Sequence, residues 1–270
     1  MSLNPLTLVL VGWVAAAMLM ALLWLVQRVG RNAAIADVGW CFGLGFVVIG
    51  YALLVEGDQD RRLLLAVMGG IYACRLGLYI LLDRVLGKPE DGRYQRMRRE
   101  WGDQAQLYFF IYFQLQAIAV AVFSLPFLVL MQNPRPTFSL WELAGILLWL
   151  VAVASESVAD WQLATFRAKP WNRDRVCREG LWRYSRHPNY FFEWVHWWAY
   201  VLMGVGLSNG WITLIAPVLM GWALLRVTGI PLAEAQALAT RGEEYRAYQR
   251  TTSAFILWFP KGEFRKERMR

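Results

Sequence analysis

The sequence predicts an all-α membrane protein with about seven transmembrane helices and a cytoplasmic amphipathic C-terminal tail. Hydrophobic residues make up 57% of the 270-residue chain and 15 residues are tryptophan, whereas soluble domains are roughly 45–50% apolar. Seven separate runs also approach the ~20 apolar residues that a helix needs to cross the hydrocarbon core. These two observations exclude an ordinary soluble domain.

The seven runs lie at about 6–26, 36–55, 63–83, 108–131, 140–166, 189–208 and 211–230. The first run lacks the basic start and the cleavage signature of a signal peptide, so we expect a retained helix. After the seventh run, apolar and charged residues mix at helical spacing from Leu232 to Arg250, and FILWFP (Phe255 to Pro260) follows. This pattern is typical of a helical tail lying along a membrane surface.

No repeat of fixed period and no flexible linker divides the chain. We therefore expect one integral-membrane domain over residues 1–270, with a cofactor-binding half at about 140–260.

The 28 basic residues are distributed unevenly among the loops. If the N-terminus lies outside, the outer loops hold only Arg61, Arg62 and Arg135, and nearly all other cations lie in the inner loops and the tail. The positive-inside rule then predicts a multi-pass membrane protein with its N-terminus outside and its C-terminus cytoplasmic. Because the loops account for the net charge of +8, membrane lipids are the expected partners and nucleic acid is not.

Seven ionisable residues fall in or at the edge of the predicted spans, where each costs roughly 2.5–3.5 kcal/mol at a helix centre. They are Asp37, Arg75, Glu142, Glu156, Asp160, Glu193 and Arg226. Several ionisable residues in one set of spans are energetically acceptable only where they pair with one another or line a water-filled cavity. We expect a few of them to be functional.

The loop between the fifth and sixth runs is strongly cationic. It carries Arg167, Lys169, Arg173, Arg175, Arg178, Arg183 and Arg186. Beside it, Glu156 and Asp160 are spaced i, i+4 and therefore share a helix face. These carboxylates can accept hydrogen bonds from ribose hydroxyls or an amide, or they can neutralise neighbouring arginines in a structural network. A cationic loop over buried polar groups predicts a site for an anionic cofactor.

The segment SRHPN surrounds the predicted start of the sixth helix with polar side chains, namely Ser185, Arg186, His187 and Asn189. Pro188 suits the first turn, where a missing N–H does no harm, and a helix N-terminus attracts anions. His187 is equally well explained as a capping or packing residue and as a catalyst. With two histidines in the chain, no metal site is predicted.

Tyr72 and Arg75 lie i, i+3 on the third predicted helix, and Asp37 lies on the second. A tyrosine beside a cation can serve as a general acid. The alternative is a structural pair between Asp37 and Arg75, with Tyr72 as a packing residue. The residues alone leave both interpretations open.

These residues resemble the motifs of the steroid 5-alpha-reductase superfamily, and in particular its bacterial DUF1295 branch, which implies a location in the bacterial inner membrane. The likeness is clearest from Glu156 to Glu193: Phe166–Pro170 (FRAKP) is similar to an LRKP-like segment, and Gly180–Tyr184 (GLWRY) to a G-G-L-F-x-Y loop. Where the family has an asparagine, this chain has Glu156. The resemblance implies that NADPH is bound by Glu156, Asp160, Arg167, Lys169, Arg175, Tyr184, Ser185, His187, Asn189, Glu193 and Arg226.

The resemblance also implies a catalytic set of Tyr72, Asp37 and Arg75. It implies an NADPH-dependent oxidoreductase acting on CH–CH groups, which reduces a carbon–carbon double bond conjugated to a carbonyl in a lipid or steroid-like substrate. Because a Gly-rich Rossmann fingerprint is missing from the sequence, we expect the cofactor to be held between helices.

An alternative function follows from RHPNY, Glu234 and EEYRAYQ (Glu243 to Gln249), which also resemble the isoprenylcysteine and phospholipid methyltransferases. Those enzymes bind S-adenosylmethionine. The seven-cation loop favours NADPH, because arginines bind phosphates in bidentate fashion and a sulfonium needs no such cluster. A non-enzymatic membrane protein is a third possibility.

Overall fold

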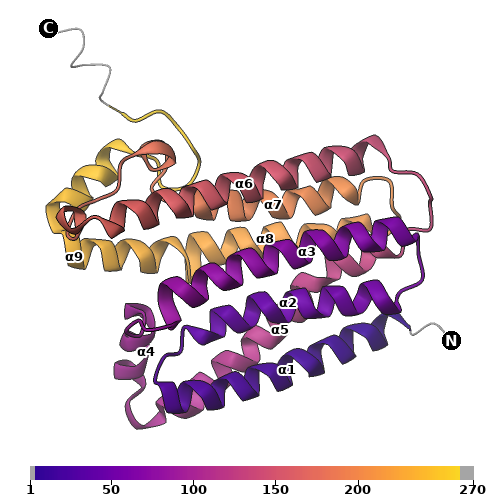
Figure 1. Ribbon diagram of the computed structural model, residues 1–270, viewed down its shortest axis with the longest axis horizontal. Coiled ribbons are helices and arrows are strands. Elements are labelled where there is room, and N and C mark those ends of the chain that lie inside the picture. Colours follow the sequence, from indigo (N-terminus) through magenta and orange to yellow (C-terminus); the bar gives the residue numbers. More distant parts are fainter. Residues whose placement is uncertain (1–3, 262–270) are drawn as a thin grey trace, which may run out of the picture. The chain divides into compact units, whose positions relative to one another are not determined.

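The computed structural model describes residues 4–261 (Figure 1), and within them every regular element is a helix. Six helical stretches among these residues are long and apolar enough to cross a membrane: Pro5–Gly30, Ile35–Leu54, Gln59–Val85, Gly92–Met131, Leu140–Ala168 and Gly210–Thr251. The prediction of an all-α, multi-pass membrane protein is thereby confirmed.

The described chain forms two compact units. The first contains residues 4–142 and 200–216, and the second contains residues 143–199 and 217–261. The second unit covers most of the predicted cofactor-binding half. The prediction of a single functional domain stays a prediction.

The first unit is built on four long helices, α1 (Pro5–Gly30), α2 (Ile35–Leu54), α3 (Gln59–Ile80) and α5 (Ala105–Met131). In Figure 1, α2 lies beside α3, and α1 and α2 both pack on α5. Asn4 caps α1 by accepting a hydrogen bond from the Leu6 N–H, and Asp58 caps α3 by accepting one from the Arg61 N–H. Short polar side chains therefore set where the apolar helices begin.

A short cationic helix, α4 (Gly92–Trp101), precedes α5, and the seven predicted spans did not include it. Its sequence is too polar to cross a membrane, but Asp91 caps its first turn by accepting from the Arg93 N–H at 3.0 Å. The Arg84 and Arg93 guanidiniums also lie near this carboxylate and hold its pKa below the ordinary value. Local capping thus stabilises a helix that hydropathy alone does not indicate.

Arg61 is the most completely buried cation of the first unit, with 1% of its surface exposed. Its Nε donates to Glu142 at 2.6 Å. The other guanidinium nitrogens donate to three backbone carbonyls of the loop before α6, those of Asn133, Arg135 and Thr137. The ionisable residue Glu142, which the sequence placed at a span edge, is therefore part of a structural ion pair.

The second unit contains most of α6 (Leu140–Ala168) and α7 (Pro188–Met203), the end of α8 (Ile215–Trp222), and α9 (Ile230–Thr251). The predicted sixth span, 189–208, ends as a helix at Met203, so α7 has 16 residues and is shorter than a standard span. The predicted seventh span, 211–230, is divided into a 3₁₀ turn, α8 and a π-helical turn over Ala223–Val227. The predicted amphipathic tail is helical as α9, with a break at Gly242.

Candidate functional site

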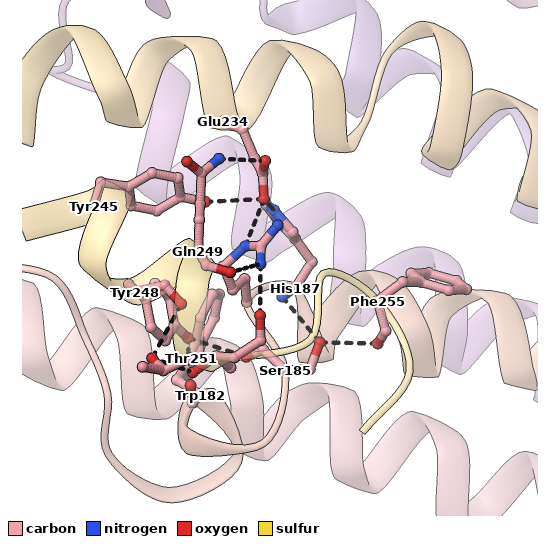
Figure 2. A network of polar contacts seen from close by, with 11 residues as sticks. Trp182, Ser185, His187, Glu234, Tyr245, Tyr248, Gln249, Thr251 and Phe255 are labelled. Carbon is pink, nitrogen blue, oxygen red and sulfur yellow. Dashed lines mark hydrogen bonds and ion pairs between the residues drawn. The ribbon is translucent and has the colours of Figure 1, made fainter. Parts of the chain in front are cut away.

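The side chain of Arg186 joins a polar network in the second unit through three hydrogen bonds. Figure 2 shows this network around Glu234, with Tyr245, Gln249 and His187 beside it. The Arg186 Nε donates to Glu234 of α9 at 2.7 Å, and its Nη1 donates to the carbonyls of Gln249 and Thr252. Its backbone N–H donates to the Ser253 carbonyl at 2.8 Å. Arg186 therefore ties the start of α7 to the end of α9.

Glu234 is the acceptor on which the network converges. Its Oε2 accepts from Gln249 at 2.8 Å, and its Oε1 accepts from the Tyr245 hydroxyl at 3.4 Å and faces His187 Nε2 at 3.4 Å. A half-buried carboxylate with this many partners keeps its charge. The sequence named Glu234 only through the methyltransferase resemblance, so this central role is a finding of the structure.

Ser185 acts as a backbone support at the start of α7. Its hydroxyl donates to the Phe255 carbonyl at 2.8 Å and accepts from the His187 N–H at 3.1 Å (Figure 2). The hydroxyl of Tyr248 in turn donates to the Ser185 carbonyl and to the Trp182 carbonyl. The proton and one lone pair of the Ser185 hydroxyl are thus used to hold the loop, and its predicted cofactor contact stays a prediction.

Three contacts hold the loop against α6. Asn189 Nδ2 donates to Asp160 at 3.0 Å, the Leu181 N–H donates to Gln162, and Trp182 Nε1 donates to the Ala159 carbonyl. Gly180 has φ +56° and packs so closely on Gln162 that a Cβ would overlap its amide, which explains the need for glycine in GLWRY. The predicted i, i+4 carboxylates are both buried, with Glu156 3% and Asp160 4% exposed.

On α7, Glu193 and His196 share one face, as the sequence predicts. Glu193 Oε1 accepts from Trp197 Nε1 at 3.1 Å, and His196 Nδ1 lies 2.7 Å from the Glu193 carbonyl. All three side chains are buried. They form a second polar group, one turn beyond Asn189 on the same helix.

The side chains of four of the seven loop cations make no hydrogen bond or ion pair with the described residues: Arg167, Lys169, Arg173 and Arg175. The remaining cations are engaged differently, because Arg186 pairs with Glu234 and Arg178 donates to the Glu244 carbonyl. The cationic loop thus contains arginines with structural partners, such as Arg178 and Arg186. We call the four cations whose side chains have no partner among the described residues the uncommitted cations.

Arg241 of α9 lies beside these uncommitted cations and is itself hydrogen-bonded, although the sequence did not single it out. Its Nε donates to the Arg175 carbonyl at 2.9 Å, and its charge is repelled by that of Arg167. Guanidiniums that approach one another without a hydrogen-bonded acid between them form a favourable place for an anion. Its position in a run of charged residues gave no sequence signal of this contact.

The side chains of two other predicted cofactor residues make no hydrogen bond with residues 4–261. The backbone carbonyl of Tyr184 accepts from the Trp258 N–H, and its ring packs edge-on against Phe259. Arg226 lies exposed on the π-helical turn after α8. For both, the contact with a cofactor stays a prediction.

The predicted catalytic residues all lie in the first unit. Tyr72 is fully buried on α3 and its ring packs edge-on against Trp40. Asp37 accepts from the Tyr94 hydroxyl at 2.7 Å and pairs with Arg93 at 3.3 Å, both on α4. The partners of Asp37 thus come from the short helix that hydropathy missed, instead of the Arg75 pairing that the sequence left open.

The imidazole of His187 is buried and stacks on the Tyr190 ring. Burial holds the pKa of His187 below its ordinary value of 6.5, because the cost of desolvating the imidazolium exceeds the attraction of Glu234. His187 is therefore neutral at neutral pH.

This shift predicts a pH dependence of stability. As the pH falls through about 6.5, the unfolded chain binds a proton that the folded chain refuses, so the free energy of unfolding should decrease. Thermal unfolding of the purified protein from about pH 7.5 to 5.5 should show this loss, and the loss should be smaller in His187→Gln. Equal losses in both proteins would assign the effect to other groups.

Taken together, the geometry defines a class: a polytopic α-helical membrane protein in which a cationic loop and an amphipathic tail enclose a buried polar network. Residues 23–252 match the family described as Protein of unknown function (DUF1295), and the chain belongs to this family. The comparisons with curated proteins and with solved structures found no match. Within residues 4–261, no group of three or more His, Cys, Asp or Glu side chains is arranged to hold a metal ion.

Proposed function

We propose that the protein is a membrane-embedded, NADPH-dependent reductase of a carbon–carbon double bond conjugated to a carbonyl in a lipid-soluble substrate. The observation that carries this proposal is the set of uncommitted cations in the second unit, Arg167, Lys169, Arg173 and Arg175, with Arg241 beside them. NADPH brings three phosphates, and arginine forks bind phosphate oxygens in bidentate fashion. The donor set therefore fits this cofactor.

In the proposed mechanism, the loop cations bind the phosphates, and the buried Asp160 carboxylate with its partner Asn189 accepts hydrogen bonds from ribose or amide groups. When bound, NADPH supplies the hydride that the reduction requires. The Tyr72 phenol would donate a hydrogen bond, and then its proton, to the substrate carbonyl oxygen, where negative charge develops during reduction. The enol formed in this way would tautomerise to the saturated carbonyl product. Asp37 supports this chemistry indirectly, by holding Tyr94 and Arg93 of α4 in place.

A second candidate, an S-adenosylmethionine-dependent methyltransferase of an isoprenoid or phospholipid, has one observation in its favour. The residues that suggested it, from RHPNY, Glu234 and EEYRAYQ, meet in one network around Glu234. However, this carboxylate is already neutralised by Arg186. We therefore interpret the network around Glu234 as structural, and the reductase remains our proposal.

The two candidates differ in which cofactor stabilises the folded protein. A ligand present at 100 times its Kd adds about 2.7 kcal/mol to the free energy of unfolding. We expect NADPH to raise the thermal unfolding temperature of the purified protein, with S-adenosylmethionine producing no shift. Protection by S-adenosylmethionine alone would replace the reductase by the methyltransferase, and protection by neither would contradict both.

The contribution of the uncommitted cations can be measured directly. Replacing Arg167 or Arg175 with alanine should weaken NADPH binding by about 1.5–3 kcal/mol each, as expected for hydrogen bonds to a charged group. Arg246→Ala is the matched control, because Arg246 is an exposed arginine of α9 whose guanidinium pairs with Glu243. If all three variants bind NADPH as the parent protein does, the loop follows the positive-inside rule and nothing more.

A further inference from the structure

The segment after α9, residues 252–261, follows a defined path along the start of α7. The Ser253 carbonyl accepts from the Arg186 N–H, the Phe255 carbonyl accepts from Ser185, and the Trp258 N–H donates to the Tyr184 carbonyl. At its end, the Lys261 N–H donates to the Thr251 carbonyl at 2.7 Å. This last bond brings the segment back to the C-terminal end of α9 and closes a loop.

The closed loop encloses a hollow of about 200 Å³. We call it the C-terminal hollow; its lining residues are Gln249, Arg250, Thr251, Thr252, Ser253, Trp258, Phe259 and Lys261. A single water needs only roughly 10–15 Å³ of such volume, so the hollow admits a considerably larger group. It is partly open to the outside, so that group can enter without unfolding the loop.

The chemistry of the lining favours an anion. Arg250 and Lys261 contribute two positive charges, and no lining residue is acidic. Both cationic side chains are exposed, and neither makes a hydrogen bond or an ion pair with residues 4–261. The Ser253 hydroxyl is a further donor without a partner among these residues. The guanidinium, ammonium and hydroxyl groups of these three side chains are all hydrogen-bond donors, and such donors bind phosphate oxygens.

The rim of the hollow is aromatic and apolar. Ile256, Trp258 and Phe259 are 59%, 67% and 68% exposed. Exposing such large apolar side chains to water is unfavourable. In a membrane protein, tryptophan and flanking cations concentrate at the headgroup level of the bilayer. Exposed rings next to Arg250 and Lys261 therefore place the C-terminal hollow at that level, where lipid phosphates are abundant.

We propose that the C-terminal hollow binds the phosphate of an anionic phospholipid headgroup, with Arg250 and Lys261 as its ligands and the rings of Trp258 and Phe259 seated among the neighbouring lipids. This site is separate from the uncommitted loop cations that the proposed reductase uses. One ligand would account for the exposed rings, for the closed loop, and for two cations whose side chains have no partner among residues 4–261.

The proposal is tested with the full-length protein in detergent by native mass spectrometry, titrating phosphatidylglycerol against phosphatidylcholine. Phosphatidylglycerol should bind with a saturable first site that phosphatidylcholine does not occupy. Arg250→Ala and Lys261→Ala should each weaken this site roughly fivefold, since one cation near an anionic surface contributes about 1 kcal/mol. Arg246→Ala removes the same charge from the same helix outside the hollow, and it should leave the affinity unchanged.

Three outcomes overturn the proposal. Equal losses in all three variants would show a diffuse electrostatic effect, and equal binding of the two lipids would show that charge plays no part. Displacement of the lipid by glycerol phosphate at equal concentration would assign the hollow to a soluble phosphate. Protection of Arg250→Ala and Lys261→Ala by NADPH should match that of the parent protein, so a failure here is distinguishable from a failure of the proposed reductase.

Discussion

Replacing Arg61 with leucine should lower the free energy of unfolding by roughly 3–5 kcal/mol, as is typical when one partner of a buried ion pair is removed. The variant leaves the Glu142 carboxylate, which is 3% exposed, without its main partner. It also removes three hydrogen bonds to loop carbonyls before α6. Denaturant unfolding in detergent micelles measures the loss.

Two further variants make this result specific. Arg135→Leu removes an exposed arginine from the same loop, and it should change the free energy of unfolding by no more than about 0.5 kcal/mol. The double variant Arg61→Leu, Glu142→Leu should recover part of the loss, because no buried charge is then left unpaired. A loss below about 1 kcal/mol in Arg61→Leu would mean that the pair is as weak as an exposed one.

Tyr72→Phe should reduce the turnover of an enone lipid by roughly 10²–10³-fold, the usual cost of losing one hydrogen-bond donor to a developing oxyanion. The ring, which packs on Trp40 in the buried core of the first unit, is retained. The variant should therefore fold and bind NADPH with near-normal affinity. The measurement is NADPH oxidation against a panel of enone lipids, with NADPH binding determined separately.

A second substitution distinguishes the proposed catalytic role of Tyr72 from the structural role of Tyr94. Tyr94→Phe removes the hydroxyl that donates to Asp37 at 2.7 Å and should loosen α4 with a smaller effect on turnover than Tyr72→Phe. If Tyr72→Phe keeps full turnover on an enone that the parent protein reduces, Tyr72 is a packing residue. His196 and Glu193 of α7 are then the next candidates for the proton donor.

Some of the local site geometry could be predicted from short-range spacing. The i, i+3 relation of Glu193 and His196 follows from helix geometry and is observed on α7. Pro188 at the first position of α7 likewise follows from backbone conformation. These predictions depend only on residues close in sequence.

The sequence by itself determined the membrane class, most of the long apolar helices and the place of the cationic loop, because hydropathy and charge are properties of single residues summed over a segment. Only the tertiary structure decided the partners of the charged side chains. Arg186, which the sequence placed around an expected anion site, pairs with Glu234, 48 residues away, and Asp37 pairs with Arg93, 56 residues away. Such pairings depend on how the helices pack, and they cannot be predicted from the spacing of residues along the chain.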